Sequence, residues 1–294
     1  MKRILITGGT GFFGKSILDC HRRCPLGELT VLSRSAFRFA ERHPELSVGV
    51  RFLEGDVRTF AVGAAKFDWV IHAATPARID VADAEMRSII LDGTANALRQ
   101  ARACGAERFM MVSSGGVYGR GFGRPFLEDD EPRPYTAYGT AKLEAERMAV
   151  DSGLFVLLPR CFAFVGKYLD RDAHFAVGNF IRDALRGKDL IITGDGSPLR
   201  SYLYADDLVD WLWAILSRGA SGRAYNVGSD EAVSIRGLAR QVCDSLGAKG
   251  VVRVLGQPVR GAANVYVPDV CRAKSELGLR VKVGLAEAIR KSIC

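Results

Sequence analysis

The chain has 294 residues, of which 48% are hydrophobic, and a formal net charge of +8. This length and apolar content suffice for one large α/β domain or for a domain with a smaller lobe. No apolar run reaches the roughly 18 residues that a membrane span needs, and the dispersed basic residues, without interleaved aromatic side chains, argue against a nucleic-acid surface. We therefore expect neither a membrane nor a nucleic-acid partner.

The seven cysteines are scattered and odd in number, which is typical of reduced cytosolic thiols rather than of a disulfide framework. The first predicted strand begins at Arg3, and because this leaves no room for a signal peptide we expect none. Cys20 and Cys24 flank His21, but no second ligand pair accompanies them, so we predict no metal site. These features indicate a cytoplasmic protein.

Short apolar segments alternate with helical patterns through the first half of the chain, as in a parallel sheet with crossover helices. The strands that this pattern predicts are residues 3–7, 29–32, 50–54, 69–72, 109–113 and 155–159. The helices between them are clearest at residues 83–103 and 137–151. After residue 159 the alternation loosens, and we predict helices at 177–186, 206–216 and 235–246 and short strands at 190–192 and 225–227.

The first predicted strand runs directly into a glycine-rich loop, and a helix follows it. Gly8, Gly11 and Gly14 have the spacing G-x-x-G-x-x-G. The first glycine permits a tight turn, the second lets the backbone approach a pyrophosphate, and the third lets the helix pack closely on the sheet. The helix N-terminus offers free N–H groups to the phosphates. We therefore predict a dinucleotide site that includes this loop with Phe12 and Phe13.

The end of the second strand bears on the choice of cofactor. An acidic residue there would favour NAD, because it accepts hydrogen bonds from free ribose hydroxyls. This chain has Ser33 and Arg34 instead, and a hydroxyl with a planar guanidinium suits a 2′-phosphate. We favour NADP, and NAD bound through backbone contacts is the alternative.

Two further strand ends complete the predicted cofactor site. Asp56, followed by Val57, comes after the third strand and is placed to meet the adenine amino group. Ala73 and Ala74 close the fourth strand with small side chains, so the backbone can run beside the cofactor. We expect His72, just before them, to be a buried core histidine.

These observations predict an α/β fold, with a Rossmann-type doubly wound parallel sheet and a smaller C-terminal substrate-binding lobe. Residues 1–160 would form the NAD(P)-binding domain. Residues 161–294 would form mainly the substrate-binding lobe, with segments at about 200–228 returning to the first domain.

A tyrosine and a lysine form the predicted catalytic pair. Of the eight tyrosines, Tyr138 alone has a lysine four residues on, Lys142, which places both side chains on one helix face. The helix follows strand 109–113, whose carboxyl end carries Ser114. Hydride transfer at a carbon requires a proton to leave or reach the attached oxygen, and a neighbouring cation makes a phenol a usable acid or base by lowering its pKa. We predict that Ser114 binds the reacting oxygen, that Tyr138 moves the proton, and that Tyr138 and Lys142 also contact the cofactor.

Residues 7–14, 112–119 and 138–142 resemble the extended short-chain dehydrogenases, and among these the nucleotide-sugar epimerase/dehydratase family is most similar. The likeness covers essentially the whole chain, because residues 200–207 and 225–228 also match later family motifs. By this resemblance Arg200 contacts the diphosphate of a nucleotide-sugar substrate, and Arg260 is a second candidate. Arg200 also argues against an uncharged ketone substrate. The resemblance further implies a homodimer, in which helices 83–103 and 137–151 pair with those of a second copy.

The chain departs from the family pattern in ways that bear on the reaction. The similar sugar 4,6-dehydratases carry Asp-Glu directly after the Ser/Thr, because elimination of water needs an added acid and base, whereas this chain has Gly115 and Gly116. The asparagine of the family's Arg-x-x-Asn stretch is replaced by Ala163, and that of its Asn-Gly-Thr stretch by Asp92. Dehydration is therefore not expected, and the placement of the substrate differs from the family pattern.

We expect an NADP-dependent reductase that acts on a 4-keto nucleotide sugar, with Tyr138 as the proton donor. A nucleotide-sugar 4-epimerase with tightly bound NAD is the first alternative, because the same three catalytic residues serve both reactions. A non-catalytic dinucleotide sensor that binds a protein partner is the second, and the presence of Tyr138 with Lys142 argues against it.

Overall fold

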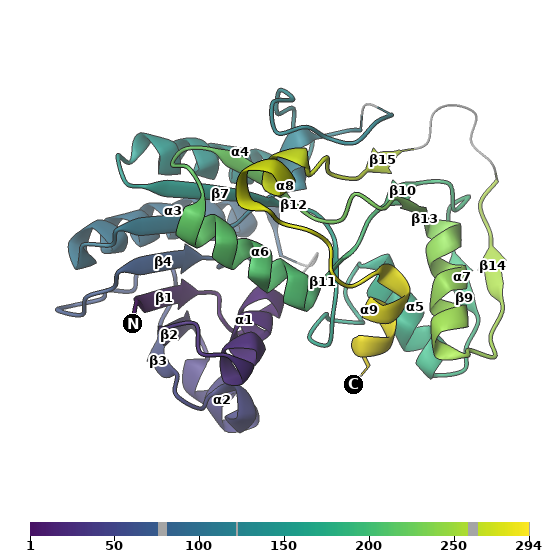
Figure 1. Ribbon diagram of the computed structural model, residues 1–294, viewed down its shortest axis with the longest axis horizontal. Helices are drawn as coiled ribbons and strands as arrows, with labels where there is room; N and C mark the ends of the chain where they lie inside the picture. The colour runs from purple at the N-terminus through teal and green to yellow at the C-terminus, as the bar shows by residue number, and fades with distance from the viewer. Residues whose placement is uncertain (76–80, 122, 258–263, 294) are drawn as a thin grey trace. The chain divides into compact units, whose positions relative to one another are not determined.

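The computed structural model describes residues 1–75, 81–121, 123–257 and 264–293. The contacts divide the chain into two compact units, both drawn in Figure 1. Unit 1 comprises Met1–Gly119, Pro132–Arg160 and Val209–Tyr225, and unit 2 comprises Arg120–Glu131, Cys161–Leu208 and Asn226–Cys294. Within the described ranges, no helix combines the length and the apolar character that crossing a bilayer requires.

A parallel sheet runs through unit 1 (Figure 1). Its strands are β1 (Arg3–Thr7), β2 (Glu28–Ser33), β3 (Arg51–Glu54), β4 (Trp69–His72), β5 (Arg108–Met111), β6 (Ser113–Ser114), β7 (Val156–Cys161) and β12 (Ala224–Val227). Their order is β12-β7-β5-β4-β1-β2-β3, with β6 paired to β7. The chain order reverses between β1 and β4, and ligands of such sheets bind at this switch point, outside the carboxyl ends of the strands. The predicted α/β class and doubly wound sheet are confirmed.

Helices cover both faces of this sheet (Figure 1). They are α1 (Phe12–Arg23), α2 (Ala36–Arg42), α3 (Asp83–Cys104), α4 (Ala137–Asp151) and α6 (Ala205–Arg218). Helices α3 and α4 pack along each other on one face. Because strand side chains alternate between the two faces, Leu5, Val70 and Phe109 meet Ile90 of α3 and Ala141 of α4 in one buried core. This core holds α4, which carries the predicted catalytic pair, against the strands.

The predicted elements of unit 1 differ little from the observed ones. Strands 3–7 and 69–72 and helix 137–151 have the observed bounds. The predicted strand 109–113 is divided, because β5 ends at Met111 and β6 begins at Ser113. Helix α2 was not predicted, since its seven residues are too few to establish a helical period.

Within the described residues, unit 2 holds three small sheets, ordered β13-β10-β15, β11-β8 and β14-β9. Their strands are β8 (Phe164–Val165), β9 (Leu190–Ile192), β10 (Leu199–Arg200), β11 (Leu203–Tyr204), β13 (Val233–Ser234), β14 (Val252–Val254) and β15 (Val265–Tyr266). The helices of this unit are α5 (Ala176–Leu185), α7 (Ile235–Leu246), α8 (Cys271–Leu277) and α9 (Leu285–Lys291). Helix α7 packs against both α5 and α9 and supplies the centre of a separate apolar core.

The segment Arg120–Glu131 belongs to unit 2, although the residues on either side of it belong to unit 1. The Asn226 side chain donates a hydrogen bond to the Phe126 carbonyl (2.8 Å), and the Asn226 backbone donates one to the Glu128 carboxylate (2.9 Å). Gly119 precedes the segment with a φ of +86°, and a Cβ there would lie 1.9 Å from the Arg133 carbonyl oxygen. The chain therefore leaves and re-enters unit 1 at neighbouring points, at a turn that only glycine permits.

Candidate active site

A pocket of about 220 Å³ lies at the carboxyl ends of the central strands of unit 1, at the switch point between β1 and β4. Five elements contribute to it: the glycine loop, the ends of β2, β3 and β4, and helix α3. The residues that line it are Gly8, Thr10, Gly11, Leu32, Ser33, Arg34, Gly55, Asp56, Val57, Ala74, Thr75 and Ile89. Sequence reasoning placed a dinucleotide at these strand ends, and the fold brings most of the predicted residues together there.

The glycine loop has the close backbone approaches that its spacing predicts. Gly8 has a φ of +74°, and a Cβ there would lie 2.7 Å from the backbone of Ala73 and Ala74. A Cβ on Gly14 would lie 2.1 Å from the Gly9 carbonyl oxygen, so any side chain would push α1 away from the loop. Gly11, by contrast, would meet only the Gly8 carbonyl oxygen at 3.5 Å, so its bare backbone faces the pocket.

Helix α1 begins at the pocket wall, because its N-cap residue is Gly11. No side chain caps this end, and its first turn carries no acidic residue. The first N–H groups of a helix have no partner within the helix and carry a partial positive charge, which suits a phosphate. Phe12 and Phe13 occupy the first turn, with their rings edge to face at 5.8 Å, and are not among the residues that line the pocket.

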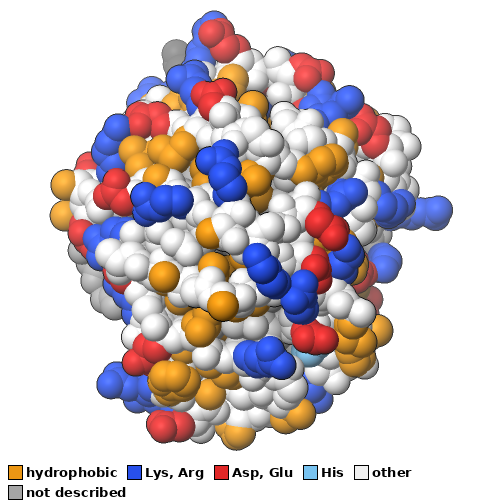
Figure 2. All heavy atoms as spheres, turned by 90° about the vertical axis from the view of Figure 1, so that its left-hand side faces the viewer, with side chains coloured by type: hydrophobic (Ala, Val, Ile, Leu, Met, Phe, Trp, Pro, Cys, Tyr) orange, Lys and Arg blue, Asp and Glu red, His pale blue; other side chains and the backbone are white. Residues whose placement is uncertain are grey.

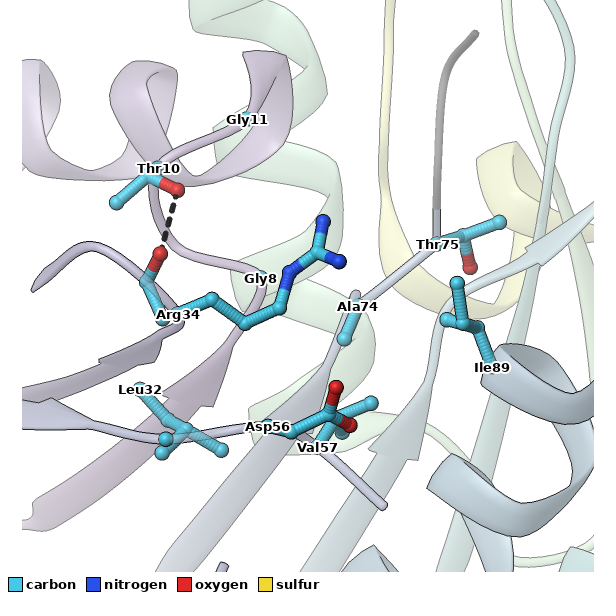
Figure 3. A pocket seen from close by; sticks show the side chains of 12 residues that line it. Gly8, Thr10, Gly11, Leu32, Arg34, Asp56, Val57, Ala74, Thr75 and Ile89 are labelled. Carbon is cyan, nitrogen blue, oxygen red and sulfur yellow. Dashed lines mark hydrogen bonds between the residues drawn. The ribbon is translucent and has the colours of Figure 1, made fainter. Parts of the chain in front are cut away.

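Arg34 projects into the pocket from the end of β2, and its guanidinium reaches toward Gly8 and Ala74 (Figure 3). Ser33 beside it shares a hydrogen bond with Thr10 of the glycine loop, at 3.0 Å between the two hydroxyl oxygens. This bond ties the end of β2 to the loop. A guanidinium and two hydroxyls on one wall of the pocket suit a phosphate ester.

Asp56 is the single carboxylate among the described lining residues, and it is already paired. The Arg58 guanidinium donates two hydrogen bonds to it, at 2.9 and 2.8 Å, and also bonds Glu85 at 3.0 Å. The hydrogen bond from Arg58 is the main cause that lowers the pKa of Asp56 below its usual value. Asp56 is therefore an ionised acceptor held in place at the pocket, with Val57 next to it in the lining.

The end of β4 forms the opposite wall. Ala74 and Thr75 line the pocket, whereas Ala73 lies beside it with its backbone N–H bonded to the Thr7 carbonyl (3.1 Å). His72 is buried as expected and bonds Thr7 at 2.8 Å and Thr94 at 3.1 Å. Burial, with repulsion from the Lys142 ammonium as a second cause, lowers the pKa of His72 to about 3. The imidazole is neutral at physiological pH and serves packing.

Ser114 and Tyr138 border the same point in the structure. Ser114 is buried at the end of β6, and its hydroxyl accepts a hydrogen bond from the Gly116 N–H at 3.0 Å. A Cβ on Gly116 would lie 3.3 Å from the Ser114 hydroxyl oxygen and 3.6 Å from the Tyr138 ring. Gly116 thus lies between the two side chains, and its missing side chain leaves space beside both.

Lys142 connects this pair to the pocket. The side chain is only 4% exposed, and its ammonium donates hydrogen bonds to the Val112 carbonyl (2.9 Å) and to the Thr75 hydroxyl (2.7 Å). Because Thr75 also lines the pocket, the ammonium lies directly behind the pocket wall. Tyr138 and Lys142 are four residues apart on α4 and therefore share one helix face. Lys142 on this face contacts the strand ends.

Of the two predicted substrate arginines, Arg200 is a described residue of unit 2. The Arg200 guanidinium donates hydrogen bonds to the carbonyls of Leu199 (2.7 Å) and Asn264 (3.1 Å) and lies over the Tyr266 ring at 5.6 Å. Both of these hydrogen bonds start from Nη1, and a guanidinium has five N–H groups in all. Arg260 lies outside the described residues.

The residues of this pocket fit a nicotinamide dinucleotide. The glycines provide close backbone approach, the start of α1 provides N–H groups, Arg34 provides a cation, and Asp56 provides a carboxylate acceptor. Thr10, Thr75 and Arg58 also shape the site, and sequence reasoning missed them. Of these three residues, only Thr75 had a signal in the sequence, because it directly follows the predicted Ala74.

Comparisons with known proteins found a matching family model and similar proteins. A family model described as the NAD dependent epimerase/dehydratase family matches residues 4–228. A UDP-glucose 4-epimerase from Mycolicibacterium smegmatis is 28% identical over 305 residues, which cover 99% of this chain and 97% of that protein.

Solved structures have the same fold. DesIV, a dTDP-glucose 4,6-dehydratase from Streptomyces venezuelae solved with NAD and TYD bound, superposes with a TM-score of 0.85 at 25% identity, over 99% of this chain and 95% of that one. RMD from Pseudomonas aeruginosa, complexed with NADPH, has a TM-score of 0.80 at 22% identity, over 100% of this chain and 98% of that one. Both forms of the cofactor therefore occur among structures of this fold.

Proposed function

The chain belongs to the NAD-dependent epimerase/dehydratase family, and from this premise we propose that it reduces a 4-keto nucleotide sugar with NADPH. The observation that carries the proposal is the hydrogen bond from Lys142 to Thr75, because it joins the Tyr138–Lys142 pair to the wall of the dinucleotide pocket. The proposed proton donor and the proposed cofactor site belong to the same unit.

In the proposed reaction, NADPH would supply, when bound, the hydride that the carbonyl carbon of the sugar accepts. Tyr138 donates its phenolic proton to the carbonyl oxygen, and the Ser114 hydroxyl holds that oxygen in place. Lys142 would hold the ribose hydroxyls beside the nicotinamide, and its positive charge would stabilise the phenolate that remains on Tyr138. Because Gly116 has no side chain, no Cβ lies between the Ser114 hydroxyl and the Tyr138 ring.

Two glycines support reduction over dehydration. Gly115 and Gly116 follow Ser114 directly, so this stretch supplies neither the acid nor the base that loss of water from the sugar would require. Reduction needs one proton donor for the ketone oxygen, and Tyr138 fills that role alone.

The choice of NADPH rests on Arg34. Its guanidinium lies in the pocket (Figure 3), and the described lining contains no carboxylate apart from Asp56, which Arg58 already engages. A 2′-phosphate would gain charge-assisted hydrogen bonds from Arg34 and would meet no unpaired negative charge.

The substrate diphosphate is assigned to Arg200, and Arg260 is a second candidate. Arg200 offers donors that its two backbone partners do not use. A nucleotide sugar with a diphosphate linkage is therefore the proposed ligand, and Arg200→Ala should raise its KM more than it lowers kcat, because the contact is equal in the ground and transition states.

The test begins with the cofactor that copurifies with the protein and continues with NADPH oxidation across a panel of 4-keto nucleotide sugars. Stoichiometric consumption of NADPH supports the reductase. Turnover of a nucleotide sugar without added cofactor, with NAD retained, supports the 4-epimerase instead, which the similarity to the mycobacterial 4-epimerase favours. Cofactor binding without any turnover would indicate a dinucleotide sensor.

We also propose that the enzyme is a homodimer that pairs α3 and α4 of two copies. An ion pair between Arg87 of α3 and Glu144 of α4, at 2.7 Å, joins the exposed sides of these helices. One face of the molecule shows apolar patches among interspersed charges of both signs (Figure 2). A monomeric mass at micromolar concentration in light scattering would refute the dimer.

A further inference from the structure

Three side chains follow one another along the same face of α4, one turn apart. Tyr138, Lys142 and Glu146 have a spacing of four residues, which places them in a row. Tyr138 and Lys142 have roles in the proposed reaction, whereas Glu146 has none. Glu146 is nevertheless only 3% exposed, and a buried carboxylate is costly unless it is paired.

Glu146 is paired within unit 1, on both of its oxygens. The Arg160 guanidinium at the end of β7 donates to Oε1 at 3.0 Å and to Oε2 at 2.8 Å. The Ser113 hydroxyl donates a third hydrogen bond to Oε1 at 2.5 Å. Arg160 is itself only 7% exposed, so this is a buried ion pair with a hydroxyl attached.

The network connects α4 to Val112, Ser113 and Gly116 of one segment. Lys142 bonds the carbonyl of Val112, Glu146 bonds the hydroxyl of Ser113, and Tyr138 lies against Gly116 beside Ser114. A shift of α4 along its axis by one residue would break both of these hydrogen bonds. The segment that carries Ser114 and the helix that carries Tyr138 are therefore locked in one register.

Arg160 holds the other side of the same segment. Its guanidinium lies over the ring of Tyr118 at 4.9 Å, and Tyr118 is completely buried at the end of the short helix Gly115–Tyr118. That helix contains Gly116, which lies next to the Ser114 hydroxyl and the Tyr138 ring. Arg160 thus contacts both Glu146 of α4 and Tyr118, which ends the short helix that contains Gly116.

We propose that Glu146 and Arg160 are positioning residues, which fix α4 against residues 112–118 and so hold Lys142 at the wall of the dinucleotide pocket. A buried ion pair is weak as a source of stability, because well-packed apolar side chains of similar volume stabilise as much or more. Its directional hydrogen bonds, however, define one register, which apolar contacts do not. This inference rests on the proposed function through the contact of Lys142 with the nucleotide.

The test is a double-mutant cycle on cofactor affinity, with NADPH and NADH titrated in parallel by nucleotide fluorescence. Glu146→Gln retains the shape of the side chain and removes the charge. We expect it to weaken binding of the preferred nucleotide about tenfold through misplacement of Lys142, and to have less than a twofold effect when Lys142→Met is already present. Equal effects in both backgrounds would mean that Glu146 does not act through Lys142, and would overturn the proposal.

A paired apolar replacement separates positioning from folding. Removal of one partner alone leaves an uncompensated buried charge, so a single variant can fail to fold. Glu146→Leu with Arg160→Met removes both charges and should restore the melting temperature to within a few degrees of the wild type while nucleotide affinity stays about tenfold weaker. Recovery of both properties together would assign the pair to stability alone.

Glu144→Gln is the matched control. Glu144 lies two residues away on the same helix and is also ion-paired, to Arg87, but at the exposed side. Its substitution should leave nucleotide affinity and kcat within twofold. If the wild type binds nucleotide but reduces no keto sugar, the proposed function fails while the affinity cycle still decides the role of Glu146. If the wild type binds neither nucleotide, both fail.

Discussion

Replacement of Arg34 by alanine should change which nicotinamide nucleotide the protein prefers. Arg34 is exposed and lines the pocket between the glycine loop and the end of β4. Hydrogen bonds to charged groups contribute roughly 1.5–3 kcal/mol, and screening at an exposed side chain places Arg34 at the lower end of that range. A loss of about 1.5 kcal/mol corresponds to about a tenfold weaker affinity.

The effect should be confined to the phosphorylated nucleotide. We expect the Kd of NADPH, measured by fluorescence titration, to rise about tenfold in Arg34→Ala, and the Kd of NADH to stay within about twofold, because a free ribose hydroxyl gains less from a guanidinium. Arg38→Ala is the control, since Arg38 is also an exposed cation, on α2, and does not line the pocket. An equal loss for both nucleotides, or an equal effect of Arg38→Ala, would refute the assignment of Arg34 to a 2′-phosphate.

Three further predictions concern the proton donor, the loop and a buried histidine. Tyr138→Phe should lower kcat by roughly 100- to 10,000-fold while NADPH still binds; unchanged turnover in a stopped-flow assay would remove Tyr138 from the mechanism. Gly14→Ala should destabilise the fold by about 1–3 kcal/mol in urea titrations, because its Cβ would overlap the Gly9 carbonyl, whereas Gly194→Ala, with open space around it and no positive φ, should cost less. The pKa of His72 is lowered to about 3 in the fold and returns to about 6.5 on unfolding. Between these two pKa values the unfolded chain binds the extra proton, so the free energy of unfolding decreases as the pH is lowered. Between pH 7.5 and 5.5 this should cost about 1.4 kcal/mol, and a His72→Gln variant with the same pH slope would contradict it.

Local signals predicted the part of the site that lies close to strand ends. Three features depend only on neighbours within a few positions: the glycine spacing, the Tyr138–Lys142 pair and the strand at residues 69–72. Such short patterns can be recognised in a single sequence. The bounds of β1, β4, α4 and α7 follow for the same reason, because their apolar periods are uninterrupted.

Contacts between residues that are far apart in the sequence could not be predicted. Lys142 meets Thr75 across 67 positions, and Glu146 meets Ser113 across 33. Such pairs depend on which strands are neighbours in the sheet and on helix orientation, and neither leaves a local pattern. Asp56 illustrates the limit: its position was predicted, but its ion pair with Arg58 follows from a turn that the sequence does not reveal. Phe12 and Phe13 were included because of the loop pattern alone, and they begin α1 without lining the pocket.

The interleaving of the two units has a consequence for biosynthesis. Strand β12 occupies the edge of the main sheet beside β7, yet it is encoded more than sixty residues after it. A nascent chain that has emerged from the ribosome only as far as Arg160 would expose β7 as an unpaired edge, which is prone to association with other chains. Completion of the nucleotide-binding sheet must therefore wait until most of the protein has been synthesised, and a truncated gene that ends near residue 160 should yield an aggregating fragment rather than a working half.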